Sequence, residues 1–491
     1  MSSLVLRNAR VVGGPKNPVD VAITDGVIAT IGAADAAGQS LDLDGRYLSP
    51  GLWDNHVHFT QWSLVRTRLD VAESESAAHA ARLVAAELAV RSAEPTLLVG
   101  YGFRDGLWPD APNLGDLDAA SGRIPVVLVS ADVHAVWLNS AALALFGRRS
   151  ETGLLREEDA FDIQRQLDTA EVDVLDRAAD AAARAAAARG VVGIVDLEMG
   201  WNAETWARRM AAGTNSLRVE IGVYAQYLER AIDLGMQTGQ RLGELLTMGR
   251  FKVITDGSLN TRTAYCDDEY PGLEGQSGSH GLITVPYDRL VPLMSQAAAA
   301  GIRSSVHAIG DRANRLAIDA FEQLGHFASG GTIEHAQLLA LDDLPRFAAL
   351  GIVASVQPEH AMDDRDVADR YWAGRTDRAF LLRSLLDAGV TLALGSDAPV
   401  APLDPWVTMA AAVTRTRDGR EPWHPEQSIS MAEALAASTR TTVAVGQPAD
   451  LVVTESDPLT SDLRTDGLRE MKVAATLVGG RLTHLSDAAF D

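Results

Sequence analysis

Residues 52–58 read LWDNHVH, an apolar run that ends in two histidines two positions apart. A short apolar run predicts a strand, and side chains two apart on a strand point to the same side. His56 and His58 are therefore expected to point together at the end of this strand. Neutral imidazole is a good ligand for zinc and similar metals, so the pair offers half of a metal site. Taken alone, the pair is equally compatible with a structural role.

Similar apolar runs recur along the chain, each followed by an Ala-rich stretch of helical period, as in residues 291–300, 313–324 and 378–387. Near-continuous apolar runs suit parallel strands that are buried on both faces. Eight such strands alternating with helices predict an α/β fold, a (β/α)8 TIM barrel. The expected strands are residues 52–58, 191–198, 217–225, 249–256, 301–307, 331–335, 351–357 and 389–397.

Both ends of the chain follow a different pattern, with short alternating strands separated by turn signals such as Asp25-Gly26 and Gly479-Gly480. This predicts a small β-sandwich domain formed by residues 1–50 and 440–491, with the barrel between them at 51–439. Residues 60–190 are too many for one strand-to-helix step, so we expect a large insertion after the first barrel strand. Its expected strands are residues 96–102 and 124–130, and its expected helices are 77–90 and 175–189.

Further ligand-type residues stand where later barrel strands end. His307 ends the fifth expected strand, His335 the sixth and Asp397 the eighth. The C-terminal ends of barrel strands are where such folds place their active sites. The chain has 11 histidines, and four of them fall at these ends. Two more imidazoles and a carboxylate added to the first pair supply both metal ligands and a base.

Lys252 lies within the apolar run of the fourth expected strand. One interpretation is a lysine whose ammonium reaches water at the end of the barrel. The other is a buried lysine, which tends to lose its charge because desolvation lowers its pKa. A neutral amine can react with carbon dioxide to give a carbamate, whose two oxygens would bridge two cations.

The order His-x-His, Lys, His, His and Asp on strands one, four, five, six and eight resembles the ligand order of the amidohydrolase superfamily in its binuclear, carboxylated-lysine form. The flanking segments DGVIATIG (25–32), LSPGLWD (48–54) and PADLVV (448–453) are similar to that superfamily's β-domain signatures. Finer motifs resemble the YtcJ-like branch, which includes N-substituted formamide deformylases. They are SADVHAVWLNS (130–140), KVITDGSL (252–259), HAIGDRA (307–313), IEHAQ (333–337) and GSDAPV (395–400).

The resemblance implies a divalent metal centre, with zinc as the best fit and one or two ions per chain. His56 and His58 would bind one ion and His307 and His335 the other, with a carbamate on Lys252 between them. Asp397, beside the first ion, would carry the proton. The implied reaction is cleavage of a C–N bond in an amide or formamide-like substrate by metal-activated hydroxide.

Two alternatives stay open. The first is a mononuclear deaminase or related hydrolase in which Lys252 is a plain ammonium. Gly310 stands three residues after His307, where a purine or pyrimidine deaminase would have a glutamate, and this disfavours deamination. The second alternative is a non-catalytic binding protein that keeps the metal as a structural staple.

Other polar and aromatic residues are candidate contacts for a substrate. His134 in the insertion is a candidate catalytic residue, and Asp256 and Asp311 are candidate partners that orient ligands. The chain has 9 Trp against 10 Phe, which favours an aromatic-walled pocket for an apolar or aromatic substrate. The candidate substrate contacts are Trp108, Trp137, Arg262, Gln357 and His360.

Composition excludes some partners. The formal net charge of −23 disfavours nucleic acid and anionic membranes as partners and favours a small-molecule substrate. Cys266 is the only cysteine, so no intrachain disulfide can form and a reducing compartment is expected. No apolar stretch approaches the length of a membrane helix, and the first residues do not resemble a signal peptide. We therefore expect a cytoplasmic protein; the resemblance permits a homodimer.

Overall fold

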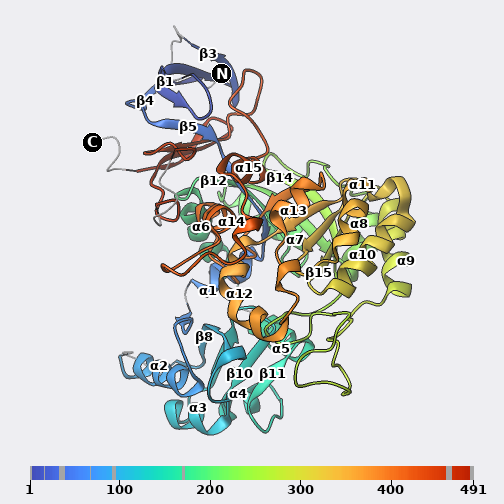
Figure 1. Cartoon of the computed structure of the whole chain (residues 1–491). Coiled ribbons are helices and arrows are strands. Elements are labelled where there is room, and N and C mark those ends of the chain that lie inside the picture. The colour runs from blue at the N-terminus through green and yellow to red at the C-terminus, as the bar shows by residue number, and fades with distance from the viewer. Residues whose placement is uncertain are drawn as a thin grey trace.

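The computed structural model describes residues 3–15, 17–32, 39–66, 68–90, 95–167, 172–460 and 467–486. Its centre is a parallel sheet of eight strands in the order β18-β17-β16-β15-β14-β13-β12-β6. The sheet closes on itself because the ends of the first and last strands bond to each other. The N–H of Asp397 donates to the His56 carbonyl at 2.7 Å, and the N–H of His58 donates to the Ala398 carbonyl at 2.7 Å. The predicted (β/α)8 barrel is confirmed (Figure 1).

Each barrel strand overlaps one of the eight runs expected from the sequence, because strands covered on both faces need continuous apolar residues. The strands are β6 (Leu52–Val57), β12 (Val191–Asp196), β13 (Arg218–Tyr224), β14 (Leu246–Ile254), β15 (Ser304–Ala308), β16 (Thr332–His335), β17 (Val353–Val356) and β18 (Thr391–Leu394).

Helices cover the outside of the barrel and bury their apolar faces against the strands, in a core that includes Ile221, Phe251 and Ile333. They are α6 (Val172–Ala187), α7 (Asn202–Ala211), α8 (Ala225–Asp233), α9 (Tyr287–Ala299), α10 (Asp311–Leu324), α11 (Leu344–Ala349), α12 (Pro358–Tyr371), α13 (Leu382–Asp387), α14 (Pro405–Thr414) and α15 (Met431–Ala437). The helix expected from residue 378 begins only at Leu382. Phe380 has a left-handed backbone (φ 53°), which an α-helix cannot contain.

Strands from the two ends of the chain pair with one another in one sheet. Its path is β21-β20-β19-β5-β1-β2-β3, with β4 paired to β1. The sheet has a hydrophobic core of its own, and Leu6, Ile23, Leu48, Leu451 and Leu477 are among its members. The strands are β1 (Ser3–Val11), β2 (Val19–Thr24), β3 (Val27–Ile31), β4 (Gln39–Asp42), β5 (Tyr47–Pro50), β19 (Leu451–Thr454), β20 (Val473–Val478) and β21 (Arg481–Leu485).

The insertion after the first barrel strand forms a five-stranded sheet in the order β11-β10-β9-β8-β7. Its strands are β7 (Leu69–Asp70), β8 (Leu98–Phe103), β9 (Val126–Ser130), β10 (Ala135–Leu138) and β11 (Leu154–Arg156), and its helices are α2 (Ala77–Val90), α3 (Leu114–Ser121), α4 (Ser140–Leu145) and α5 (Glu158–Leu167). The segments at its two ends, α1 (Phe59–Val65) and α6, pack instead into the barrel core. Among the described residues, none of the helices is long and apolar enough to cross a membrane.

Candidate metal centre

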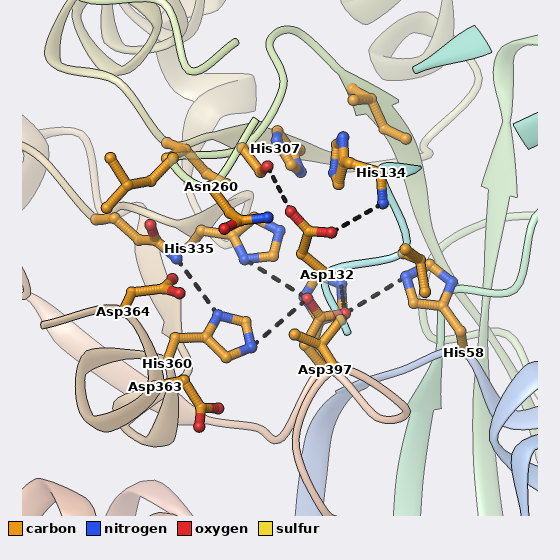
Figure 2. Close-up of a pocket in the computed structure, with 18 of the residues that line it drawn as sticks. His58, Asp132, His134, Asn260, His307, His335, His360, Asp363, Asp364 and Asp397 are labelled. Atoms are coloured by element: carbon orange, nitrogen blue, oxygen red, sulfur yellow. Dashed lines mark hydrogen bonds and ion pairs between the residues drawn. The ribbon is translucent and has the colours of Figure 1, made fainter. Parts of the chain in front are cut away.

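All six predicted ligands line one pocket, whose empty volume is ≈ 740 Å³ (Figure 2). They are His56 and His58 at the end of β6, Lys252 in β14, His307 in β15, His335 at the end of β16 and Asp397 after β18. The barrel brings them together because parallel strands end at the same rim, so residues far apart in sequence become neighbours. Loops of the insertion close one side of this pocket, which His134 also lines.

Asp397 stands at the centre of the cluster. Its Oδ1 lies 3.4 Å from Nε2 of His56 and 3.5 Å from Nε2 of His58. Its Oδ2 lies 4.0 Å from Nδ1 of His335 and 3.9 Å from Nε2 of His360 (Figure 2). Nitrogen-to-oxygen distances of this size exceed those of good hydrogen bonds. Asp397 is thus shared by two groups that could each hold a metal ion, one with His56 and His58 and the other with His335 and His360.

Several buried donor atoms in this cluster lack a hydrogen-bond partner within the described part of the chain. They are Nζ of Lys252, Nδ1 of His58, Nε2 of His307, Nδ1 of His335 and Nε2 of His360. A buried polar atom without a partner is destabilising, so such atoms are few in folded proteins. Their concentration at one point shows that the residues fit a divalent metal.

Burial also sets the protonation state that a metal requires. It lowers the pKa of His58 to about 3 and holds the pKa values of His307 and His335 well below the ordinary value. These imidazoles are therefore neutral at physiological pH. Neutral imidazole is the form that coordinates a metal, so binding need not first remove a proton.

Lys252 is only 1% exposed, and its amine is one of the unpartnered atoms. Burial lowers its pKa, although the nearby carboxylates Glu334 and Asp397 act in the opposite direction. The interpretation of Lys252 as a side chain that reaches water is wrong. A buried amine with reduced basicity, next to metal-type ligands, has the properties that carbamate formation needs.

Glu334 is a functional residue that the sequence reasoning passed over. His56 Nδ1–H donates to its Oε2 at 2.7 Å, which leaves Nε2 of the ring facing Asp397. Ser305 and Thr332 also donate to its other oxygen. His56 and Lys252 hold the pKa of Glu334 well below its usual range in spite of burial, so the carboxylate is ionised. Such a partner fixes the tautomer and direction of a ligand.

We predict that Glu334→Gln weakens metal binding by about 10- to 100-fold, the usual effect of removing a carboxylate that orients a ligating histidine. The measurement is metal affinity by competition with a chelator of known strength. Glu455→Gln is the control, since Glu455 pairs with Arg46 in the terminal sheet. Equal affinity in the two variants would show that Glu334 does not orient His56.

Strand geometry explains why Glu334 was missed. Successive residues of a strand point to opposite faces, so Glu334 and His335 should not both reach the centre. His335 has a left-handed backbone (φ 74°), and so does Asp397 (φ 58°). Such conformations cost about 1–3 kcal/mol each in non-glycine residues and concentrate at functional sites. Here they turn two ligand side chains at the strand ends.

The two aspartates expected to orient ligands differ in their surroundings. Asp256 lies 3.4 Å from Nε2 of His307 and accepts backbone N–H groups of Ile309, Gly310 and Tyr265. Burial raises its pKa to about 7. Asp311 instead accepts the backbone N–H of Asp267 and pairs with Arg378, so it anchors loops and does not contact a ligand.

His134 lines the pocket from the insertion, with its ring centroid 6.4 Å from that of His307. Its Nδ1–H donates to Oε2 of Glu157 at 2.9 Å. Burial acts to lower the pKa of His134, but the charge and hydrogen bond of Glu157 outweigh it and raise the pKa to about 9. Glu157 is held in turn by the hydroxyls of Thr261 and Thr263. No pattern in the sequence pointed to Glu157, which stands in an acidic run just before α5.

The expected aromatic contacts are corrected. Trp108 packs on Phe103 and donates to the Ser74 carbonyl, and Trp137 is fully buried in the core of the insertion. No tryptophan of the described chain lines the pocket, because these rings fill the cores that hold the insertion together. The apolar lining comes from smaller residues and two other rings: Val133, Phe161, Met199, Tyr224, Ile254, Leu259, Ile309 and Val400.

Of the remaining candidate substrate contacts, one lines the pocket and two do not. His360 lines the pocket beside Asp397. Gln357 lies behind His56, with its Nε2 3.4 Å from Nδ1 of that ring, so it contacts a ligand and does not line the pocket. Arg262 points its guanidinium at the ring of Tyr371, 5.3 Å from the centroid, and Asn260 lines the pocket in its place.

Three charged residues at the mouth were not predicted. Arg104, after β8 of the insertion, pairs with Asp363 of α12 at 3.0 Å and lies 4.0 Å from Asp364. All three line the pocket. In the sequence the two aspartates look like part of a solvated acidic helix face, and only the fold turns them toward the pocket. Burial raises the pKa of Asp364 to about 7.

The chain is similar to known proteins over most of its length. It is 25% identical to YtcJ of Bacillus subtilis, covering 94% of this chain and 95% of that protein. It is 26% identical to the N-substituted formamide deformylase of Arthrobacter pascens, covering 92% and 91%. The crystal structure of a metal-dependent hydrolase from Pyrococcus horikoshii has the same fold, with a TM-score of 0.78, 22% identity and coverage of 94% and 99%.

These similarities confirm the resemblance to the YtcJ-like and formamide deformylase-like branch that the motifs indicated. The model of the amidohydrolase family matches residues 39–484, which include β6, all later barrel strands and every predicted ligand. The match therefore covers the barrel, the insertion and part of the terminal sheet, whose strands β1, β2 and β3 precede it. The chain belongs to the amidohydrolase family.

Proposed function

We propose that the protein hydrolyses the C–N bond of a small amide or formamide-like substrate with the help of a divalent metal. The observation that carries the proposal is the cluster itself: Asp397 among four imidazoles, next to the buried and unpartnered amine of Lys252. When bound there, a metal such as zinc supplies a Lewis acid and makes water nucleophilic near neutral pH.

In this proposal some residues bind the metal and others act on the substrate. His56 and His58 would hold one ion and His307 and His335 a second, with the carboxylated Lys252 between them. Asp397 is the base in this proposal, because its carboxylate lies among His56, His58, His335 and His360 and can pass a proton to the leaving nitrogen. His134 faces the same pocket from the insertion, supported by Glu157, and is placed to contact the substrate.

The lining supports a substrate with an apolar substituent. Phe161, Met199 and Leu259 are among the residues that give the pocket an apolar surface beside its polar groups. The relative from Arthrobacter pascens is named for N-substituted formamides, which carry a substituent on the amide nitrogen. We therefore place an N-substituted formamide or short amide with an apolar or aromatic group first among candidate substrates.

A panel of substrates tests the proposal. Zinc-loaded protein should hydrolyse N-benzylformamide and N-alkylformamides with release of formate and amine, measured as kcat/KM. Cytosine and related bases serve as the comparison, since their turnover would indicate a deaminase. Release of ammonia from the bases without release of formate from the amides would overturn the proposal.

A further inference from the structure

We propose that Asp364 and Gln337 form a subsite that binds an ammonium or other strong N–H donor of the substrate, away from the scissile bond. The inference rests on the proposed function and specifies the chemical class of its substrate. Both residues line the same pocket as the metal ligands. Asp364 comes from α12 after the seventh barrel strand, and Gln337 follows the sixth strand, two residues after His335.

Asp364 has an incompletely satisfied carboxylate. Its nearest cation is Nη1 of Arg104 at 4.0 Å, which is beyond hydrogen-bond distance. In the described chain, no group donates a hydrogen bond to it. Its neighbour Asp363 is different, because Nη2 of Arg104 at 3.0 Å and Nη1 of Arg417 at 2.8 Å both bind it. Both aspartates face the guanidinium of Arg104, and the ion pair with Asp364 is the longer and weaker of the two.

Gln337 supplies an independent observation. It is only 3% exposed, and its Nε2 contacts Nδ1 of His360 at 3.3 Å. Its Oε1 is buried and has no hydrogen-bond partner among the described residues. A buried amide oxygen without a donor is unfavourable, so a ligand that donates a hydrogen bond to it stabilises the site.

The two acceptors lie on a side of the pocket that suits a bifunctional substrate. Figure 2 shows Asp364 next to His360, on the other side of Asp397 from His58 and away from His134. A substrate with its amide at the metal cluster would place a second polar group at the subsite through a connecting chain. Charge-assisted hydrogen bonds from an ammonium would use both acceptors. The geometry points to N-acylated diamines, or amides with a comparable distal N–H donor.

A matched pair of substrates tests the subsite. The monoformyl derivative of diaminobutane and formylated pentylamine differ only in a terminal ammonium against a methyl group. In the wild-type protein, kcat/KM should be about 10- to 100-fold higher for the ammonium compound, the usual effect of a hydrogen bond to a charged group. Asp364→Asn should remove most of this preference.

The control is Asp366→Asn, which makes the same change on the same helix at a residue paired with Arg420 outside the pocket. It should keep the preference. Equal kcat/KM for the two compounds in the wild type, or an unchanged preference in Asp364→Asn, would overturn the inference. If neither compound is hydrolysed, the proposed function fails separately, and the dissociation constants of the same pair, measured by calorimetry, decide the subsite by the same comparison.

Discussion

Replacing Lys252 by alanine is expected to remove bound metal and reduce turnover by at least about 10³-fold. The expectation follows from the position of Lys252, which is buried in β14 among ligand-type side chains with an amine that no described group binds. A carbamate there would supply two oxygens to the metals. Loss of Lewis-acid assistance removes several kcal/mol of transition-state stabilisation, and each 1.4 kcal/mol is about tenfold in rate.

Short carboxylic acids should partly restore metal content and turnover in Lys252→Ala, because a carboxylate offers the same two oxygens. Lys472→Ala is the matched control, since Lys472 is exposed and lies far from the cluster in sequence, just before β20. It should behave as the wild type. Normal metal content in Lys252→Ala with no response to carboxylic acids would favour the mononuclear alternative, in which the lysine is an ammonium.

Replacing Asp397 by asparagine is expected to lower kcat by about 10²–10⁴-fold, the usual contribution of a positioned acid–base group. The amide keeps the size of the side chain but cannot take a proton. His56, His58, His307 and His335 remain, so most of the metal should stay bound. KM should change much less than kcat, because the substrate binds mainly through the pocket walls.

Asp387→Asn provides the control for this change, since Asp387 is exposed and pairs only with Arg383 in the described chain. Its kcat should equal that of the wild type. If Asp397→Asn retained near-normal kcat with its metal in place, Asp397 would be only a ligand and the proton would have another carrier.

The candidate ligands could be predicted from the sequence because each stands at the end of, or inside, an apolar run. Each of His56, His307 and His335 follows an apolar run that suits a buried parallel strand, and all barrel strands end at one rim. Lys252 was recognisable for the same reason, as a charged residue inside such a run. The terminal sheet was predictable from alternation and turn residues at both ends of the chain.

Residues that act across elements were not predictable in this way. Glu157 and Asp364 belong to acidic runs that look like solvated helix faces, and only tertiary packing brings them to His134 and to the pocket. The prediction that Trp108 and Trp137 contact the substrate was wrong for a different reason. A large ring can wall a pocket or fill a core equally well, and sequence does not show which neighbour surrounds it. Here both rings stabilise the insertion.

The most direct test of the account is the metal content of the purified protein, measured together with hydrolysis of an N-substituted formamide. The account predicts about one to two divalent ions per chain, loss of hydrolysis when a chelator removes them, and recovery when zinc is returned. Hydrolysis that continued at full rate after the metal had fallen below detection would contradict it.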